Sequence, residues 1–413
     1  MKRLSVPLAI MFLLSACSKS DNNPTPPPVT PPVDSAKLTL NSMVYTTGDI
    51  GQLVALDANT GKRKWAFTLD IRANVNSTKI LSSPTLSNGV LYIGSSDHNV
   101  YAIDAATGMK KWSFLTLTYN VPEFNYYESS PVVANGTVFI GGDKMYAIDA
   151  ATGTLKWSYK TIREITSSPC YYNGYVYVND LQGIAYTFDA INGSLIQQYS
   201  GLYQQETLFD INSPHVHRGF LYNMGRADWS TVSSYAKLYT TNLLGDDQTF
   251  PIIGFPGEQP SFSSTPVFCG DSLYVALRNT LYAYKDSTPF TMQFRWKASF
   301  DSSIDVTIPV ADTGHIYVPC NKGALYALKT SDGSRDWTFK ADDGWVISSP
   351  TLANGILYFA TKDYFHAIYA RTGKEIWRIP TTGNYYWQSS AVVLTKSGKI
   401  IHSNATASSD ESD

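Results

Sequence analysis

The stretch YAIDAATGMKKW (101–112) recurs along the chain with small changes. A close copy, YAIDAATGTLKW, occupies 146–157, and VALDANTGKRKW occupies 54–65. Weaker copies follow the same pattern: YTFDAINGSLI (186–196), YALKTSDGSRDW (326–337) and HAIYARTGKEIW (366–377). Self-similarity of this kind is typical of a repeat architecture, in which one structural unit is built several times.

A second element, a Ser-Ser-Pro-like step followed by a short apolar run, lies between these copies. It occurs eight times, as SSPTL (82–86), SSPVV (129–133), SSPCY (167–171), NSPHV (212–216), STPVF (264–268), TIPVA (307–311), SSPTL (348–352) and SSAVV (389–393). The intervals run from 38 to 52 residues and average about 44, which is typical of one four-stranded propeller blade. Four of the eight steps lead into an Asn-Gly turn such as NGVLYIG (88–94), a strong hairpin signal.

We therefore predict an all-β fold: a single eight-bladed β-propeller with four-stranded blades over residues 37–404. Two segments, 41–48 and 398–404, qualify as the second strand of the eighth blade. We expect strands from the N- and C-terminal ends to close that blade together, with the choice between the two segments left open. Residues 405–413 are expected to form a disordered tail.

The recurring segment has a mainly structural explanation. Asp57, Asp104 and Asp149 can accept hydrogen bonds from backbone N–H groups of the turn. Gly61, Gly108 and Gly153 stand where a left-handed backbone would close the hairpin. Large indoles recur at one position of the last strand, where each can be buried against a neighbouring blade: Trp65, Trp112, Trp157, Trp296, Trp337 and Trp377.

The first residues indicate export rather than fold. Lys2 and Arg3 precede a short apolar run, which predicts a signal peptide over 1–16 that is too short to span a membrane. The run ends in Leu-Ser-Ala-Cys, which resembles the bacterial lipobox, so we expect acylation of Cys17 and a lipid anchor. Six prolines at positions 24–32 predict an extended stalk within 17–36.

Charge and cysteine content narrow the possible functions. With 32 Lys and Arg against 34 Asp and Glu, the sequence lacks the excess of positive charge that is typical of nucleic-acid-binding proteins. The remaining cysteines, Cys170, Cys269 and Cys320, are interpreted as single thiols, with a Cys269–Cys320 bridge left open. No phosphate loop, nucleophile elbow or His-Glu-x-x-His motif occurs, and we expect no cofactor and no metal.

The pattern Ala-x-Asp-x-x-Thr-Gly-x-x-x-Trp resembles the quinoprotein (PQQ-like) repeat family. It is complete at 55–65, 102–112 and 147–157, whereas the copies at 327–337 and 367–377 carry Lys329 and Tyr369 at the Asp position. The resemblance covers about 42–403 and implies the propeller fold. Together with the lipidated Cys it is similar to the lipoprotein propellers of the outer-membrane β-barrel assembly machinery, which implies an outer-membrane protein partner.

The residues before each Ser-Ser-Pro-like step do not repeat, and we expect them to surround one mouth of the central channel. Variable loops on a rigid scaffold often carry function, and aromatic side chains beside carboxylates suit a binding surface. The candidate binding rim consists of Tyr126, Tyr127, Glu128, Glu164, Asp210, Asp305, Trp345, Tyr386 and Trp387. His215 and His217 point the same way on a strand, yet we interpret them as a structural or polar pair rather than metal ligands.

Three functions remain in competition. The first is a non-enzymatic, membrane-anchored scaffold for protein–protein interaction at the bacterial outer membrane, on either its periplasmic or its surface face. The second is a cell-surface module that binds a glycan or peptide through the aromatic rim. The third is a PQQ-dependent dehydrogenase, which the repeat family also includes; those enzymes carry adjacent cysteines beside the quinone, and this chain has no Cys-Cys pair.

Overall fold

The computed structural model describes residues 42–48, 51–69, 80, 82–116, 129–199, 213–226, 236–242, 249–255, 265–288, 291–304, 307–381 and 389–402. All of them belong to the compact unit Lys37–Asp413. The predicted signal peptide, Cys17, the stalk and the tail lie outside the described residues. Regular structure in the described ranges consists of β-strands alone. Within them, no helix has the length and apolar character needed to cross a bilayer.

The described strands form eight antiparallel sheets. Seven contain four strands, and their chain order equals their spatial order. The first four of these are β4 (Thr85–Ser87), β5 (Val90–Gly94), β6 (Asn99–Asp104) and β7 (Lys110–Leu115); β8 (Val132–Ala134), β9 (Thr137–Gly141), β10 (Met145–Asp149) and β11 (Leu155–Tyr159); β12 (Cys170–Tyr172), β13 (Tyr175–Asn179), β14 (Ala185–Asp189) and β15 (Leu195–Tyr199); and β16 (His215–His217), β17 (Phe220–Arg226), β18 (Ala236–Asn242) and β19 (Thr249–Phe255).

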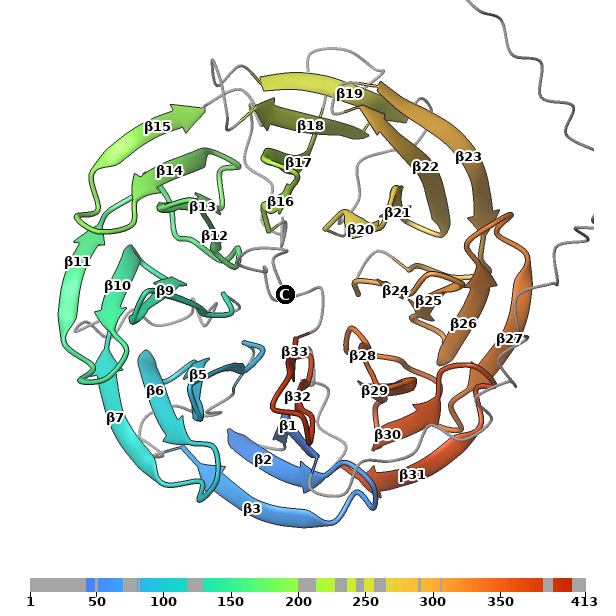
Figure 1. The fold of residues 1–413 in the computed structure, drawn as a ribbon, viewed down its shortest axis with the longest axis horizontal. Coiled ribbons are helices and arrows are strands. Elements are labelled where there is room, and N and C mark those ends of the chain that lie inside the picture. Colours follow the sequence, from blue (N-terminus) through green and yellow to red (C-terminus); the bar gives the residue numbers. More distant parts are fainter. Residues whose placement is uncertain are drawn as a thin grey trace, which may run out of the picture. The chain divides into compact units, whose positions relative to one another are not determined.

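The other three four-stranded sheets follow in the C-terminal half. They are β20 (Val267–Cys269), β21 (Ser272–Leu277), β22 (Thr280–Thr288) and β23 (Thr291–Ser299); β24 (Val310–Ala311), β25 (His315–Cys320), β26 (Ala324–Lys329) and β27 (Arg335–Lys340); and β28 (Thr351–Ala353), β29 (Ile356–Ala360), β30 (Tyr364–Tyr369) and β31 (Glu375–Pro380). Figure 1 shows the sheets following one another around a common centre, and each four-stranded sheet has its first strand innermost. The predicted all-β class with four-stranded antiparallel sheets is confirmed.

The eighth sheet has five strands rather than the four predicted, and it joins both ends of the described chain. Its order is β3 (Arg63–Thr68), β2 (Gln52–Asp57), β1 (Met43–Gly48), β32 (Val392–Leu394) and β33 (Ile400–Ile401). Both candidate segments are therefore used: β1 takes the second-strand position beside β32, whereas β33 is added at the inner edge. Tyr45, which is 2% exposed, brings β1 into the apolar core between this sheet and the β4–β7 sheet.

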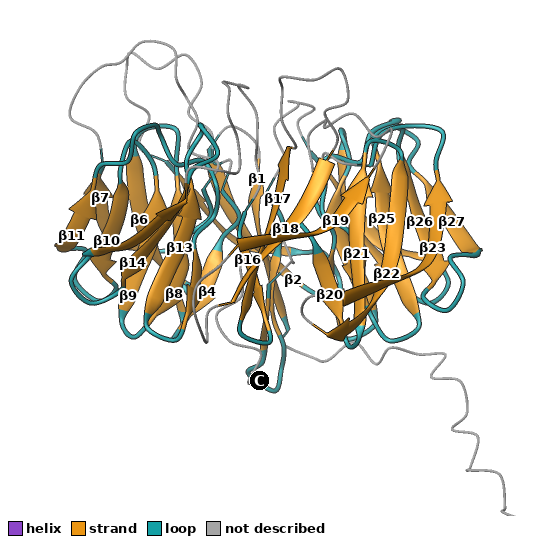
Figure 2. Cartoon of the chain, turned by 90° about the horizontal axis from the view of Figure 1, so that it is seen from above, coloured by secondary structure: helices purple, strands orange, loops and turns teal. Residues whose placement is uncertain are grey.

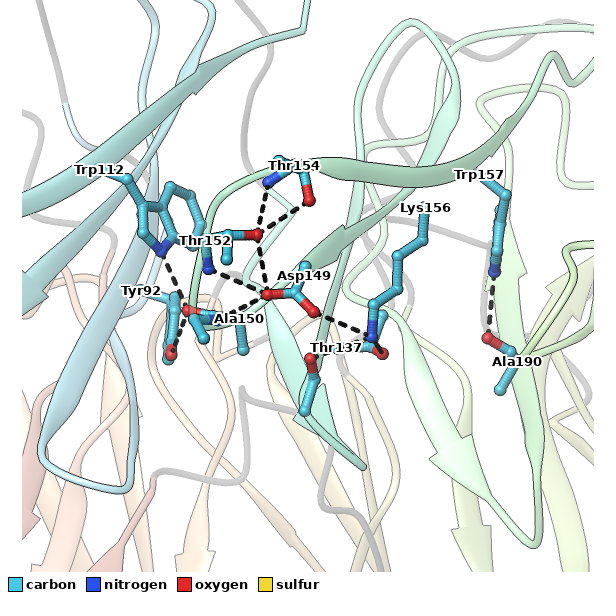
Figure 3. A network of polar contacts seen from close by, with 12 residues as sticks. Tyr92, Trp112, Thr137, Asp149, Ala150, Thr152, Thr154, Lys156, Trp157 and Ala190 are labelled. Carbon is cyan, nitrogen blue, oxygen red and sulfur yellow. Dashed lines mark hydrogen bonds and ion pairs between the residues drawn. The ribbon is translucent and has the colours of Figure 1, made fainter.

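The corner between the third and fourth strands is built as the sequence predicts. Asp149 Oδ1 accepts the backbone N–H of Ala151 and Thr152 at 3.1 and 2.9 Å, and the Thr152 hydroxyl at 2.9 Å. Gly153 then adopts a φ of +74°. Figure 3 shows this corner, with Lys156 Nζ 3.4 Å from Asp149 Oδ2. The hydrogen bonds of Thr152 to Asp149, from its backbone N–H and its hydroxyl, hold the pKa of that carboxyl below its usual value.

The recurring tryptophans connect six of the corners to the sheet before them. The indole Nε1–H donates to a corner carbonyl of the following sheet at 3.0–3.1 Å in six pairs: Trp65 with Ala105, Trp112 with Ala150, Trp157 with Ala190, Trp296 with Thr330, Trp337 with Ala370 and Trp377 with Ala58. The indole also lies over a corner glycine, so close that a Cβ on Gly108 would be 2.7 Å from the Trp65 ring. The Trp377 pair links the β28–β31 sheet to the five-stranded sheet that contains β1 and β32.

The Ser-Ser-Pro-like steps bond the innermost strands to one another. The first serine of a step forms a hydrogen bond within its own sheet. Ser82 Oγ, for example, accepts the Gly94 N–H at 2.9 Å. The second serine accepts a backbone N–H from the preceding sheet at 2.8–3.0 Å, in five bonds: Ser83 to Ser130, Ser130 to Ser168, Ser168 to Ser213, Ile308 to Ser349 and Ser390 to Ser83, donor first. These buried bonds explain why small hydroxyl residues recur there.

Candidate interaction face

Two kinds of connection lie on one face of the sheets, which we call the connector face. The first kind links the outermost strand of one sheet to the innermost strand of the next. The second kind links the second strand of a sheet to its third strand. Because all the sheets are antiparallel, both kinds lie at the same strand ends, and the Asn-Gly turns and corners lie at the opposite ends. Figure 2 shows the turns gathered at these two faces.

The structure describes two residues of the predicted binding rim, and both lie in connections of the connector face. Glu164 and Trp345 are described, and both are exposed. The others lie outside the described residues: Tyr126, Tyr127, Glu128, Asp210, Asp305, Tyr386 and Trp387. The site can therefore be built from two connections, 161–166 and 342–346.

The connection 161–166 is held by both neighbouring hairpins. The Ile165 N–H donates to the Gly142 carbonyl, and the Glu164 carbonyl accepts the Leu181 N–H, each at 2.8 Å. The Arg163 N–H donates to Asp180 Oδ2 at 3.2 Å. With its backbone fixed, this loop presents the Glu164 carboxylate and an apolar side chain, Ile162, which is 60% exposed.

The connection 342–346, which we call the Trp345 loop, is held more extensively. Asp343 Oδ2 accepts the Thr361 hydroxyl and the Asp363 N–H, each at 2.6 Å. The Trp345 carbonyl accepts the Lys362 N–H at 3.1 Å. On its other side the loop packs so closely on Gly323 that a Cβ there would lie 2.5 Å from the Gly344 carbonyl carbon.

The Trp345 side chain extends from this fixed backbone and is 52% exposed. Among the described residues no ring contact to its indole is recorded. Arg378 lies nearby in the network of the loop: it is 2.9 Å from Asp342 Oδ2 and 4.4 Å above the Tyr364 ring. The loop therefore presents a large apolar surface beside charged groups of both signs, a combination that suits recognition of another molecule.

A chain of hydroxyl, imidazole and carboxylate lies directly beneath the Trp345 loop. Thr361 Oγ1 is 3.0 Å from His366 Nε2, and His366 Nδ1 is 2.9 Å from Glu375 Oε2. The same kinds of groups serve nucleophilic catalysis elsewhere. Here, however, Thr361 is 0% and His366 1% exposed, so no substrate atom can approach the hydroxyl. The hydroxyl and the imidazole thus form a buried polar pair, whereas the Glu375 side chain is 34% exposed.

Sequence reasoning missed this network. Its one local signal is the first residue of HAIYARTGKEIW (366–377), where His366 stands in place of the Tyr found in the corresponding copies at 101, 146, 186 and 326. The other members come from three different segments, so their meeting depends on the fold.

His215 and His217 lie in a seam that departs from the repeat. Both rings stack on Phe268 of the next sheet, with centroids 5.4 and 4.2 Å away. His217 Nε2 is 3.4 Å from Asp286 Oδ2, and both side chains are buried. Asp286 occupies the corner position that elsewhere accepts a tryptophan N–H. The backbone shows the equivalence: the Asp286 N–H donates to the Asp271 carbonyl, as the Ala105 N–H donates to the Gly89 carbonyl.

The described residues contain no group of three His, Cys, Asp or Glu side chains able to hold a metal ion. The two histidines thus form a polar, aromatic contact between sheets in this part of the chain. Cys170, Cys269 and Cys320 form no disulfide, so the Cys269–Cys320 bridge left open by the sequence is not present in the described residues.

Comparison with known proteins gives one family. The model described as outer membrane protein assembly factor BamB matches residues 32–125, 122–222 and 291–408, which is more than half of the chain. No curated protein matches. The crystal structure of BamB from Moraxella catarrhalis is similar with a TM-score of 0.56 and 16% identity, covering 77% of this chain and 88% of that one.

Two further solved structures share the fold. The computationally designed protein Ika8 has a TM-score of 0.58 and 13% identity, covering 78% of this chain and 94% of its own. Quinohemoprotein alcohol dehydrogenase from Comamonas testosteroni has a TM-score of 0.54 and 14% identity, covering 76% and 70%. At these identities the likeness concerns the fold and not the activity.

Proposed function

The chain belongs to the family described as outer membrane protein assembly factor BamB, and from this premise we propose that it is a non-enzymatic, membrane-anchored scaffold that binds another protein. We place the binding surface on the connector face. The partner we propose is an outer-membrane protein of the β-barrel assembly machinery. No role in binding nucleic acid and no cofactor is part of this proposal.

The scaffold we propose is a single closed propeller of eight blades, each blade being one of the eight sheets. Three contacts of the five-stranded sheet support closure. The strands β1 and β32 pair within it, the Trp377 indole of the β28–β31 sheet reaches its Ala58, and its Ser390 N–H reaches Ser83 of the β4–β7 sheet. A closed ring leaves few free strand edges and holds the connecting loops at fixed spacing.

The anchor we propose is an acylated Cys17 after removal of 1–16, with the proline-rich residues to 36 as a stalk and the protein held at the outer membrane. The lipobox-like sequence before Cys17 supports this part of the proposal. An acyl chain supplies membrane affinity through burial of its methylene groups, whereas the stalk holds the binding surface away from the bilayer.

The observation that carries the scaffold function is the Trp345 indole, 52% exposed on a backbone fixed from both sides. An aromatic side chain on an ordered backbone loses little backbone freedom when a partner covers it, and exposed aromatic residues dominate the binding energy of many interfaces. A non-enzymatic role is also supported by the burial of Thr361 and His366, the hydroxyl and imidazole members of the Thr361–His366–Glu375 chain.

The test is site-specific photo-crosslinking in intact cells. A photoreactive amino acid at Trp345 is compared with one at Ile191, which is 86% exposed at a corner on the opposite face. We expect an outer-membrane assembly protein to be captured reproducibly from position 345 and not from 191. Capture of no reproducible protein from 345, or the same capture from both positions, would contradict the proposal.

A glycan or peptide ligand is the second candidate, because the exposed Trp345 indole can also stack on a sugar ring or cover an apolar peptide side chain. Glycan arrays with the wild-type protein and Trp345→Ala distinguish this candidate. Binding that disappears in the variant while crosslinking yields no protein would favour the glycan.

A further inference from the structure

A tyrosine on the third strand ties four of the sheets to their connector face. Each of these tyrosines directly precedes an alanine or threonine that pairs with the fourth strand. The tyrosine hydroxyl donates to a nearby aspartate in four pairs: Tyr101 to Asp97 at 2.5 Å, Tyr146 to Asp143 at 2.5 Å, Tyr186 to Asp180 at 3.0 Å and Tyr326 to Asp301 at 3.2 Å. Burial raises the pKa of Tyr186 and of Tyr326, so these hydroxyls keep their protons at neutral pH.

The β28–β31 sheet has a histidine at this position. His366 precedes Ala367, which pairs with Trp377 just as Ala147 pairs with Trp157. Its ring stacks on Phe359 at 5.2 Å and meets the edge of Phe339 at 5.2 Å. At this position the β28–β31 sheet therefore has an imidazole, which can gain a proton, where the four other sheets have a tyrosine hydroxyl, which keeps its proton at neutral pH.

The histidine reaches its aspartate through an intermediate hydroxyl. Thr361 Oγ1 lies 3.0 Å from His366 Nε2 and 2.6 Å from Asp343 Oδ2. On the other side of the ring, Nδ1 is 2.9 Å from Glu375 Oε2. Glu375 Oε1 is 3.8 Å from Arg378 Nε, and Arg378 Nη1 is 2.9 Å from Asp342 Oδ2. The network therefore begins and ends at neighbouring aspartates of the Trp345 loop.

Counting protons shows that these contacts depend on the charge of His366. A neutral ring that donates from Nδ1 to Glu375 has a lone pair at Nε2, and this lone pair competes with Asp343 for the single hydroxyl proton of Thr361. A doubly protonated ring donates from Nε2 to Thr361 instead, which leaves the Thr361 proton for Asp343. The imidazole then no longer competes for that proton, and the Tyr364 carbonyl, 3.1 Å from Thr361 Oγ1, is the other acceptor within reach.

We propose that His366 is a proton-operated latch that fixes the Trp345 loop through Thr361 and Asp343 when the imidazole is charged. The latch rests on the proposed function insofar as Trp345 is a binding residue. By linkage, whatever strengthens the Thr361–Asp343 bond also favours protonation of His366.

The groups around His366 set where the latch operates. Glu375 and Arg378 face it from β31 and Asp343 from the Trp345 loop, whereas β27 and β29 contribute the uncharged Phe339 and Phe359. Burial lowers the pKa of His366 from its usual 6.5, and the hydrogen bond to Glu375 opposes part of that change. The transition therefore lies on the acid side of 6.5.

Fluorine NMR of the full-length protein labelled with 5-fluorotryptophan tests the latch without any partner. The Trp345 resonance, one of nine, is assigned by its loss in Trp345→Phe. We expect it to shift with pH with a midpoint below 6.5, and to lose this titration in His366→Asn. His315→Asn is the matched control, because His315 contacts Asp336 on the exposed β27 rather than the loop.

Thr361→Val separates the latch from a general acid effect, because it keeps the shape of the side chain and removes the hydroxyl. We expect the Trp345 resonance to stop titrating in Thr361→Val and to titrate as wild type in Thr361→Ser. Glu375→Gln is an independent arm if the valine variant does not fold, and we expect it to move the Trp345 midpoint to lower pH. An unchanged midpoint there, or an unaltered titration in folded Thr361→Val, would overturn the latch.

The outcome is distinguishable from failure of the proposed function. A Trp345 resonance that follows His366, without any protein captured from position 345, would retain the latch and refute the scaffold. Capture of a partner with a pH-independent Trp345 resonance would do the reverse.

Discussion

Gly108→Ala tests the contact between an indole and the corner of the next sheet, and Gly89→Ala is its internal control. Both glycines lie in the β4–β7 sheet and both have a φ of +74°. A methyl group on Gly89 meets nothing within 4 Å, whereas one on Gly108 lies 2.7 Å from Cδ2 and Cε3 of Trp65. The two variants therefore share the backbone cost and differ in the clash.

The expected magnitudes follow from these distances. Placing a Cβ in the left-handed region costs about 1–2 kcal/mol, which is the whole effect expected for Gly89→Ala. Overpacking of a well-packed contact adds about 1–3 kcal/mol, because the fused ring of Trp65 cannot yield as a flexible side chain would. We expect Gly108→Ala to lower the free energy of unfolding by about 2–5 kcal/mol.

Urea denaturation followed by circular dichroism measures both variants, and Trp65→Ala completes a double-mutant cycle. With the indole removed, the added methyl has space, so the combined loss should be smaller than the sum of the single losses by about 1–3 kcal/mol. Equal losses in the two glycine variants, within about 0.5 kcal/mol, would refute the idea that the indole constrains the corner. Additive losses in the cycle would refute it independently.

Three further predictions concern the seams and the buried histidine. Deletion of 389–402 removes β32 and β33 together with the Ser390–Ser83 bond, and we expect a sharply lower urea midpoint than for deletion of 405–413. Ser130→Ala removes the acceptor of the buried Ser83 N–H, so it should cost about 1–3 kcal/mol, whereas Ser397→Ala at an exposed turn should be nearly neutral in the same assay. Because burial lowers the pKa of His366 from 6.5, the unfolded chain takes up that proton first. The free energy of unfolding should therefore fall as pH drops from about 6.5 toward the folded-state pKa, by at most about 1.4 kcal/mol per pH unit. In His366→Asn this part of the slope should vanish; an unchanged slope would contradict the assignment.

The parts of the fold that depend on local chemistry were predictable from the sequence. The corner of Asp149, Thr152 and Gly153 is a turn of five residues, so the local sequence alone predicts its hydrogen bonds and its left-handed glycine. The period of the Ser-Ser-Pro-like steps likewise predicted sheets of four strands. What those serines do was not predictable, because Ser130 accepts its bond from Ser83, 47 residues earlier and on another sheet.

The candidate site was less predictable for the same physical reason. Exposure of Trp345 on a connecting loop follows from the repeat pattern, but its support does not. Asp343, Thr361 and Glu375 come from a connecting loop, a hairpin and an outermost strand, and only the assembled sheet brings them to His366. The choice among the eighth-blade segments also depended on pairing between distant parts of the chain.

The pairing of β1 with β32 has a consequence for the order of events during synthesis and folding. Thr47 on β1 bonds the Ser389 hydroxyl, and these residues are 342 positions apart. Throughout elongation β1 therefore presents an unpaired edge, of the kind that captures strands from other chains. Its own partner is synthesised more than 300 residues later, so completion of this sheet is a late and slow step. A factor that shields β1 until β32 is synthesised would raise the yield of folded protein without contributing any contact to the folded molecule.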